Sequence, residues 1–203
     1  MIKNVVFDIG NVLAEFRYND YIREIGIPEE KAQRLAAITA ESPYWPLMDK
    51  GILTKDMTMY NCISLEPSLE PEVRLFFKDM RRLVMEYPDS CEWIRSVKEA
   101  GRKVYLLSNY SLENFEMAEN EGLFKFLGME DGRVISYKER LLKPGEEIYK
   151  VLFERYGLDP KECVFLDDSA RNIETAVRLG MKGIVVKDRS LAKAELTRIL
   201  EEK

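Results

Sequence analysis

The sequence predicts an α/β fold: a doubly wound parallel sheet with helices on both faces and an inserted all-helical segment. Short apolar, β-rich runs alternate with segments of helical periodicity through most of the chain. One long helical stretch interrupts that alternation directly after the first such run. At about 150 residues per domain, 203 residues accommodate one domain and an insertion. We therefore expect an α/β core at residues 1–15 and 87–203 and a helical cap at 16–86.

The first strand is expected at Ile2–Phe7, an apolar run that ends in the turn Asp8–Asn11. From about Asn19 to Met85 the pattern is helical and contains no convincing strand. Proline, acidic residues and threonine are typical of helix starts, and they predict three helices here. Those helices should begin near Pro28, after Thr54 and near Pro71.

After Tyr87 the expected strands and helices alternate, and glycines mark several helix ends. Strands are predicted at 103–107, 133–136, 163–166 and 183–186. Helices are predicted at 88–100, 112–121, 144–156, 170–179 (capped by Ser169) and 191–202.

The composition excludes several classes of function. The chain contains no histidine, which excludes Ser-His-Asp and Cys-His catalysis and every imidazole metal site. With 31 basic and 36 acidic residues the net charge is −5, so we expect no nucleic-acid partner. We also expect no membrane span and no signal peptide. Three cysteines without C-x-x-C spacing predict reduced thiols in a cytoplasmic protein.

Polar residues with useful chemistry follow the predicted strands. They are Asp8 after the first strand, Ser108 and Asn109 after the second, Lys143 before the next helix, and Asp167 and Asp168 after the fourth strand. Ligands of open α/β sheets bind at the carboxyl ends of the strands, so these side chains should converge. Carboxylates without His or Cys favour a hard cation, most simply Mg²⁺. A lysine and a hydroxyl beside it predict a phosphate site, where a carboxylate can act as nucleophile.

Four segments in order resemble the four motifs of the haloacid dehalogenase (HAD) superfamily. They are Val5–Leu13, Leu107–Asn109, Lys143–Pro144 and Phe165–Ile173. The resemblance covers nearly the whole chain. It implies a Rossmann-like HAD core, and the helical insertion resembles that superfamily's cap. The segment Met48–Thr54 is similar to a cap turn of its phosphatase members.

The resemblance also implies roles for individual residues. Asp8 is the expected nucleophile, and Lys143 balances the charge of Asp8 and the phosphate. The expected metal ligands are Asp8, the carbonyl of Gly10 and Asp168, with Asp167 reaching the metal through water or supporting Asp168. Ser108 and the backbone of Asn109 are expected to bind phosphate, and Asn172 is expected to orient the fourth-motif loop. Apart from the resemblance, Asn11 is expected either to contact phosphate or water or to serve as a turn residue with an unusual backbone.

One position departs from the superfamily's commonest pattern. Most of its phosphatases carry a second aspartate two residues after the nucleophile, where this chain has Gly10. That aspartate protonates the leaving group and then activates water, a contribution of about 10²–10⁴-fold. Glycine can transfer no proton, so the identity of the proton donor is open.

Three functions are compatible with this pattern. The first is a Mg²⁺-dependent phosphatase of the D-x-G-N subgroup, resembling glucose-1-phosphate phosphatase and acting on a small phosphorylated metabolite. The second is a 2-haloacid dehalogenase, which needs no proton for its halide. The third is a catalytically impaired binding or regulatory protein. The Asp167–Asp168 pair favours the phosphatase, because adjacent buried carboxylates without a cation are costly. The substrate and the oligomeric state are open.

Overall fold

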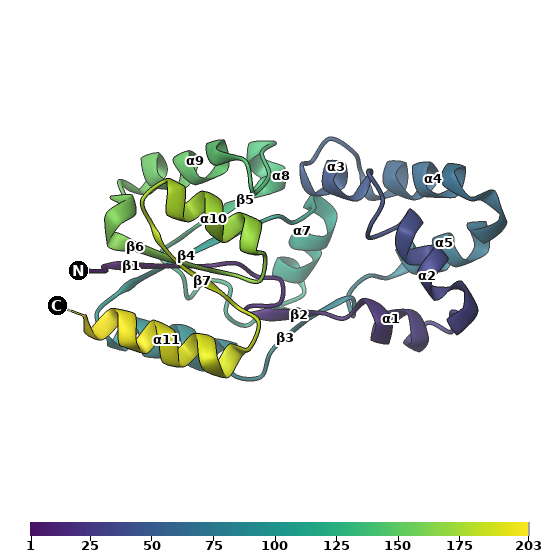
Figure 1. Cartoon of the computed structure of the whole chain (residues 1–203). Coiled ribbons are helices and arrows are strands. Elements are labelled where there is room, and N and C mark those ends of the chain that lie inside the picture. Colours follow the sequence, from purple (N-terminus) through teal and green to yellow (C-terminus); the bar gives the residue numbers. More distant parts are fainter. Residues whose placement is uncertain (203) are drawn as a thin grey trace.

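The computed structural model describes residues 1–202 and contains a five-stranded parallel sheet in the order β5-β4-β1-β6-β7 (Figure 1). This arrangement confirms the predicted fold class. The five strands are β1 (Asn4–Phe7), β4 (Lys103–Ser108), β5 (Gly132–Ile135), β6 (Cys163–Asp167) and β7 (Lys182–Val185). Each lies within a few residues of its predicted position.

Helices cover both faces of the sheet (Figure 1). Val5 and Phe7 of β1 pack toward one face, with α6 (Ser90–Glu99), α7 (Leu112–Asn120) and α11 (Arg189–Glu201). Val6 packs toward the other face, with α9 (Glu146–Tyr156) and α10 (Ala170–Arg178). Successive side chains of a strand point to opposite faces, so a strand buried on both sides is apolar throughout. The short elements α8 (Ser136–Glu139) and η2 (Pro160–Glu162) complete this part of the chain.

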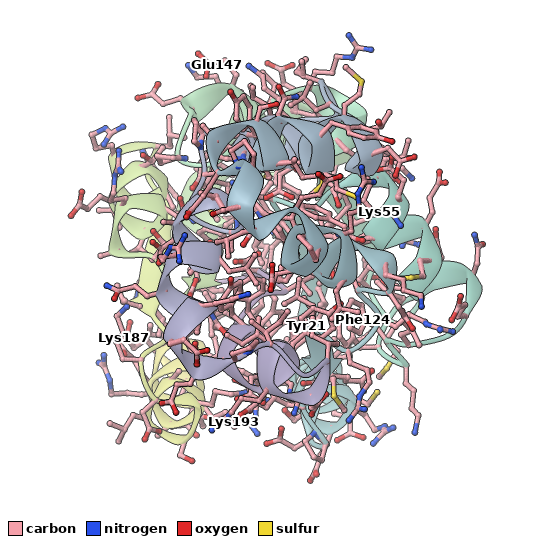
Figure 2. The ribbon with its side chains drawn as sticks, turned by 90° about the vertical axis from the view of Figure 1, so that its right-hand side faces the viewer. Tyr21, Lys55, Phe124, Glu147, Lys187 and Lys193 are labelled. Carbon is pink, nitrogen blue, oxygen red and sulfur yellow. The ribbon has the colours of Figure 1, made fainter. Side chains whose placement is uncertain are left out.

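The inserted segment forms a separate group of helices, which lies in front of the sheet in Figure 2. It comprises α1 (Tyr18–Glu24), α2 (Glu29–Ile38), α3 (Trp45–Asp49), α4 (Lys55–Leu65), η1 (Pro67–Leu69) and α5 (Glu70–Lys78). The insertion has its own apolar core, which includes Tyr21, Leu35 and Phe76. Thr54 caps α4 as predicted, because its hydroxyl accepts a hydrogen bond from Met57 N.

A two-stranded antiparallel ribbon connects the insertion to the sheet. It pairs β2 (Ala14–Phe16) with β3 (Val84–Glu86). The prediction that Asn19–Met85 contains no strand was therefore wrong at Val84 and Met85. Each strand has three residues and pairs only with a segment about 70 positions away, so neither produces a local pattern. The expected core and cap boundaries fall at this ribbon and stay a prediction.

No helix within residues 1–202 combines the length and the apolar character needed to cross a lipid bilayer. The cytoplasmic location inferred from the cysteines stays a prediction.

Candidate active site

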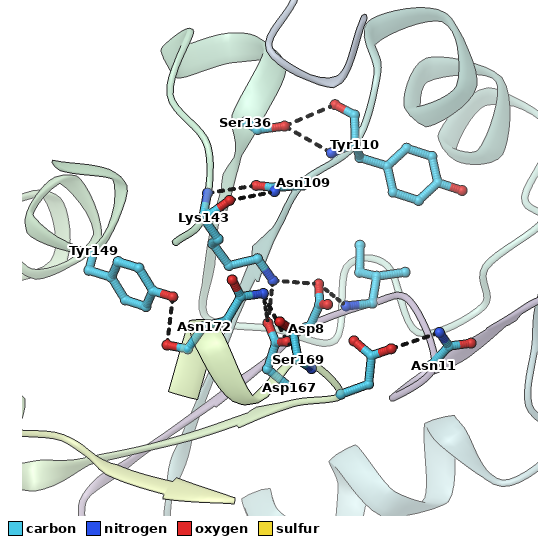
Figure 3. Close-up of polar contacts among 12 residues, drawn as sticks. Asp8, Asn11, Asn109, Tyr110, Ser136, Lys143, Tyr149, Asp167, Ser169 and Asn172 are labelled. Atoms are coloured by element: carbon cyan, nitrogen blue, oxygen red, sulfur yellow. Dashed lines mark hydrogen bonds and ion pairs between the residues drawn. The ribbon is translucent and has the colours of Figure 1, made fainter. Parts of the chain in front are cut away.

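Three adjacent strands bring the predicted site residues to one edge of the sheet (Figure 3). Asp8 directly follows β1, Ser108 ends β4 and Asp167 ends β6. Since β1 lies between β4 and β6 and all three run parallel, their carboxyl ends meet at the same edge. This is where ligands bind in open α/β sheets.

Lys143 lies between two buried carboxylates. Its Nζ atom is 2.9 Å from Oδ1 of Asp8 and 2.6 Å from Oδ2 of Asp167. Burial works against the charge of Lys143, but the two carboxylates outweigh it and raise its pKa above the ordinary value. Burial raises the pKa of Asp8, Lys143 opposes that shift, and the nearby Asp167 charge adds to it. One ammonium group therefore does not fully compensate for the buried negative charge.

The side chain of Asn109 fixes the backbone of Lys143. Its Oδ1 atom accepts a hydrogen bond from Lys143 N at 2.9 Å, and its Nδ2 atom donates to Lys143 O at 3.0 Å. The sequence resemblance had pointed only to the backbone of Asn109, whose contact with phosphate stays a prediction. Ser108 is buried at the cavity, and its hydroxyl has no hydrogen-bond partner within residues 1–202. A phosphate oxygen would satisfy this hydroxyl.

Asp167 uses both carboxylate oxygens within the protein. Oδ1 accepts from Ser169 N at 2.8 Å and from Asn172 Nδ2 at 2.9 Å. Oδ2 accepts from Lys143 Nζ and from Asn172 Nδ2, the latter at 3.0 Å. Asn172 thus orients Asp167, and Tyr149 in turn donates from its hydroxyl to the Asn172 carbonyl at 2.9 Å (Figure 3). Ser169 stands at the start of α10 as predicted, but its side chain makes no capping hydrogen bond.

The acidic cluster has the donor atoms that a divalent cation requires. One carboxylate oxygen each of Asp8, Asp167 and Asp168 lie within 4.8 Å of one another. The hydrogen bonds among the described residues use Oδ1 of Asp8 and Oδ2 of Asp168, which leaves one oxygen free on each. All-oxygen ligands suit Mg²⁺, whose charge would also balance the cluster. Gly10 lines the same cavity, and its carbonyl stays a predicted ligand.

Asn11 has a left-handed backbone, with φ of 55°, and its amide links two parts of the site. Its Nδ2 atom donates to Oδ2 of Asp168 at 2.8 Å, and its Oδ1 atom accepts from Phe16 N at 3.0 Å. The side chain therefore connects Asp168 to β2. A turn role, one of the two alternatives, matches this geometry, whereas direct contact with phosphate stays a prediction.

A cavity of about 260 Å³ lies over this edge and is lined by both the sheet side and the insertion. Asp8 and Asp168 line it from the sheet side, and Trp45 and Asp49 line it from the insertion. Burial, and secondarily the charge of Asp8, raise the pKa of Asp49 to about 7. The sequence indicated the turn that contains Asp49 but not the direction of its side chain, so this carboxyl was not among the predicted site residues.

Two of the curated relatives of this chain carry names of different activities. The chain is 24% identical over 202 residues to a sesquiterpene phosphatase of Aspergillus oryzae, covering 98% of this chain and 96% of that protein. It matches 123 residues of mouse acyl-CoA dehydrogenase family member 10 at 28% identity, but spans only 11% of that protein's length.

Two solved structures share the fold. A HAD family enzyme of Bacteroides thetaiotaomicron, in complex with magnesium and inorganic phosphate, superposes with a TM-score of 0.70 at 22% identity, covering 94% of this chain and 98% of that chain. A dehalogenase in an intermediate complex superposes with a TM-score of 0.74 at 17% identity, covering 100% of this chain and 98% of that chain. The sequence also matches the family model described as haloacid dehalogenase-like hydrolase over residues 2–180. The chain therefore belongs to the haloacid dehalogenase-like hydrolase family.

Proposed function

We propose that this hydrolase is a Mg²⁺-dependent phosphatase that cleaves a small phosphate monoester through an aspartyl-phosphate on Asp8. The observation that carries the proposal is the acidic cluster of three carboxylates, of which only Asp8 and Asp167 pair with the ammonium group of Lys143. A halide displacement needs no cation at this edge, whereas transfer of a dianionic phosphoryl group needs several positive charges around it. Bound Mg²⁺ supplies charge neutralisation and orients the phosphate.

In the first half-reaction the free oxygen of Asp8 attacks phosphorus in line with the ester oxygen. The bond from phosphorus to that oxygen breaks, and the alcohol leaves with a proton. Lys143 lies against Asp8 and stabilises the charge on the transferring group. Ser108 donates its unpartnered hydroxyl to a phosphate oxygen. Asp168, the Gly10 carbonyl and Asp8 would hold Mg²⁺, and Asp167 lies against Lys143 and positions it.

In the second half-reaction water attacks the phosphorus of the acyl phosphate. The bond from phosphorus to the Asp8 oxygen breaks, which releases inorganic phosphate and regenerates the carboxylate. The insertion lines one side of the cavity, so it shields part of the site from bulk water during the first step.

One solved structure and one relative support phosphoryl transfer and suggest substrates, whereas the dehalogenase structure supports the alternative function. The Bacteroides thetaiotaomicron structure contains magnesium and inorganic phosphate, and the Aspergillus oryzae relative is named as a sesquiterpene phosphatase. Aromatic and aliphatic side chains, among them Phe16, Trp45 and Phe124, line much of the cavity. A sesquiterpenyl monophosphate therefore belongs in the substrate panel beside the sugar phosphates that the D-x-G-N pattern favours.

The test is release of inorganic phosphate from this panel by the full chain, with Mg²⁺ and with EDTA. We expect release that requires Mg²⁺ and that Asp8→Asn abolishes. Asp56→Asn is the matched control, because Asp56 is an exposed carboxylate on α4. Turnover that survives EDTA would overturn the metal assignment. Halide release from a 2-haloacid, with no phosphate release from the panel, would favour a dehalogenase. Tight binding of a phosphorylated compound without turnover would favour the impaired regulatory protein.

A further inference from the structure

The leaving alcohol needs a proton, and Gly10 has no side chain to provide it. A Cβ atom at Gly10 would meet no heavy atom within 4 Å, so packing does not require glycine at this position. Steric crowding around the Cβ position therefore does not explain why an acidic residue is missing here. Another residue around the cavity can supply this proton instead.

Three side chains outside the acidic cluster line the cavity and carry an ionisable group: Asp49, Tyr110 and Arg81. Burial, and then the charge of Asp49, push the pKa of Tyr110 well above its ordinary value. The hydrogen bond to Asp79 likewise raises the pKa of Arg81. Neither group releases its proton near neutral pH, whereas a carboxyl can. Asp49 is therefore the best-suited donor among the described residues of the cavity.

The structure fixes Asp49 against the sheet side of the cavity. Asp49 is the last residue of α3, and its backbone carbonyl accepts a hydrogen bond from Ser136 Oγ at 2.5 Å. The same Ser136 oxygen accepts from Tyr110 N at 2.8 Å, two residues after Ser108 (Figure 3). Ser136 thus connects the end of α3, which carries Asp49, to the segment that follows Ser108 at the end of β4.

Gly51, two residues after Asp49, lies close to the backbone of Tyr137 in α8. It has a φ of +69°, and a Cβ atom there would lie 2.7 Å from the carbonyl oxygen of Tyr137. Only glycine combines this backbone conformation with so close an approach. Contacts at the Asp49 carbonyl and at Gly51, two residues later, therefore hold the backbone that carries Asp49.

The electrostatic surroundings suit a group that gives and then takes a proton. Burial raises the pKa of Asp49 to about 7, and the charge of Asp8 contributes in the same direction, while a hydrogen bond to Trp45 opposes it. General acid–base catalysis is most efficient when the pKa lies near the working pH.

We propose that Asp49 is the general acid and base of this site, an assignment that rests on the phosphatase function proposed above. As Asp8 takes the phosphoryl group, the carboxyl proton of Asp49 passes to the leaving oxygen. The resulting Asp49 carboxylate then accepts a proton from the water that attacks the acyl phosphate. Each cycle thus returns Asp49 to its protonated form.

The test compares the wild type with Asp49→Asn on two substrates whose leaving groups differ in basicity. A simple alkyl phosphate needs a proton on its leaving oxygen, whereas para-nitrophenyl phosphate releases a stable phenolate without one. In rapid-mixing experiments with para-nitrophenyl phosphate, we expect the variant to release one equivalent of nitrophenol in a fast burst and then to turn over slowly. With the alkyl phosphate we expect no burst and a loss of about 10²–10⁴-fold in the first half-reaction.

The burst separates a proton-transfer role from a structural one. If Asp49→Asn slows the nitrophenol burst as much as it slows the alkyl reaction, Asp49 only maintains the structure of the site. If turnover of both substrates is unchanged, Asp49 has no role in the reaction. Either result overturns the assignment. Asp56→Asn should behave as wild type on both substrates. If the wild type turns over the panel and Asp49→Asn gives either of the two contrary results, the role of Asp49 is refuted but the proposed phosphatase function is not. Absence of wild-type turnover on every substrate refutes the proposed function and the role of Asp49 together.

Discussion

The raised pKa of Asp49 predicts that removing its charge stabilises the protein at alkaline pH. The pKa of Asp49 rises from 3.8 to about 7. Each pKa unit corresponds to about 1.36 kcal/mol, so ionising the folded protein costs at most about 4 kcal/mol. Solvent reaches part of this half-buried side chain, which reduces the expected effect to about 1–3 kcal/mol. Asparagine has the same shape and carries no charge.

The sign follows from proton binding. Between about pH 4 and about pH 7 the folded state keeps the Asp49 proton that the unfolded state loses, so this contribution to stability falls as the pH rises. Asp49→Asn should therefore match the wild type more closely at about pH 4 and exceed it at about pH 8. Urea unfolding in EDTA, followed by tryptophan fluorescence, measures the difference, with Asp56→Asn as control. A stability difference that does not change with pH would refute the reasoning.

Three further substitutions test the other contacts. Lys143→Met leaves Asp8 and Asp167 buried without a cation and should cost about 3–5 kcal/mol in urea unfolding, whereas exposed Lys150→Met should cost little. Asn172→Ala removes the amide that orients Asp167, so calorimetry should show about 10–100-fold weaker Mg²⁺ binding. The control is Asn120→Ala, because Asn120 is exposed. Equal Mg²⁺ affinities of the two variants would contradict this role of Asn172. Gly51→Ala should raise KM and should lower the free energy of unfolding by more than Gly26→Ala does. Both glycines have positive φ, but only at Gly51 would a Cβ atom contact backbone, that of Tyr137. Equal losses of unfolding free energy would exclude the contact with Tyr137 as the cause.

The sheet could be predicted from the sequence because its signals are local. β1 and β6 are short apolar runs, each followed directly by an aspartate, and glycines such as Gly157 mark the ends of helices. Parallel strands joined by helices admit few arrangements, so these elements were sufficient to predict the fold class. The convergence of Asp8, Ser108 and Asp167 then followed from the direction of the strands.

The remaining features depend on contacts that no local pattern encodes. β2 and β3 are stable only as partners of each other. The side chain of Asn109 binds the Lys143 backbone 34 positions away, which its place beside Ser108 does not reveal. The sequence predicts Asp167 as a water-mediated metal ligand or as a support for Asp168, but it does not reveal that Lys143, Asn172 and Ser169 N contact its oxygens. The direction of Asp49 depends on how the insertion contacts α8.

The two chemical tasks of the site come from different parts of the chain. Asp8, Lys143 and Asp167 are held together by the sheet and by ion pairs within the core, independently of the insertion. Asp49 belongs to the insertion and reaches the cavity only because Ser136 and Tyr137 hold its loop. In the proposed mechanism, phosphoryl transfer to Asp8 therefore depends on Asp49 only for leaving groups that need a proton. On this proposal, cleavage of an alkyl ester requires both parts in place, and we expect the contact between them to select substrates by the basicity of the leaving group as well as by its shape.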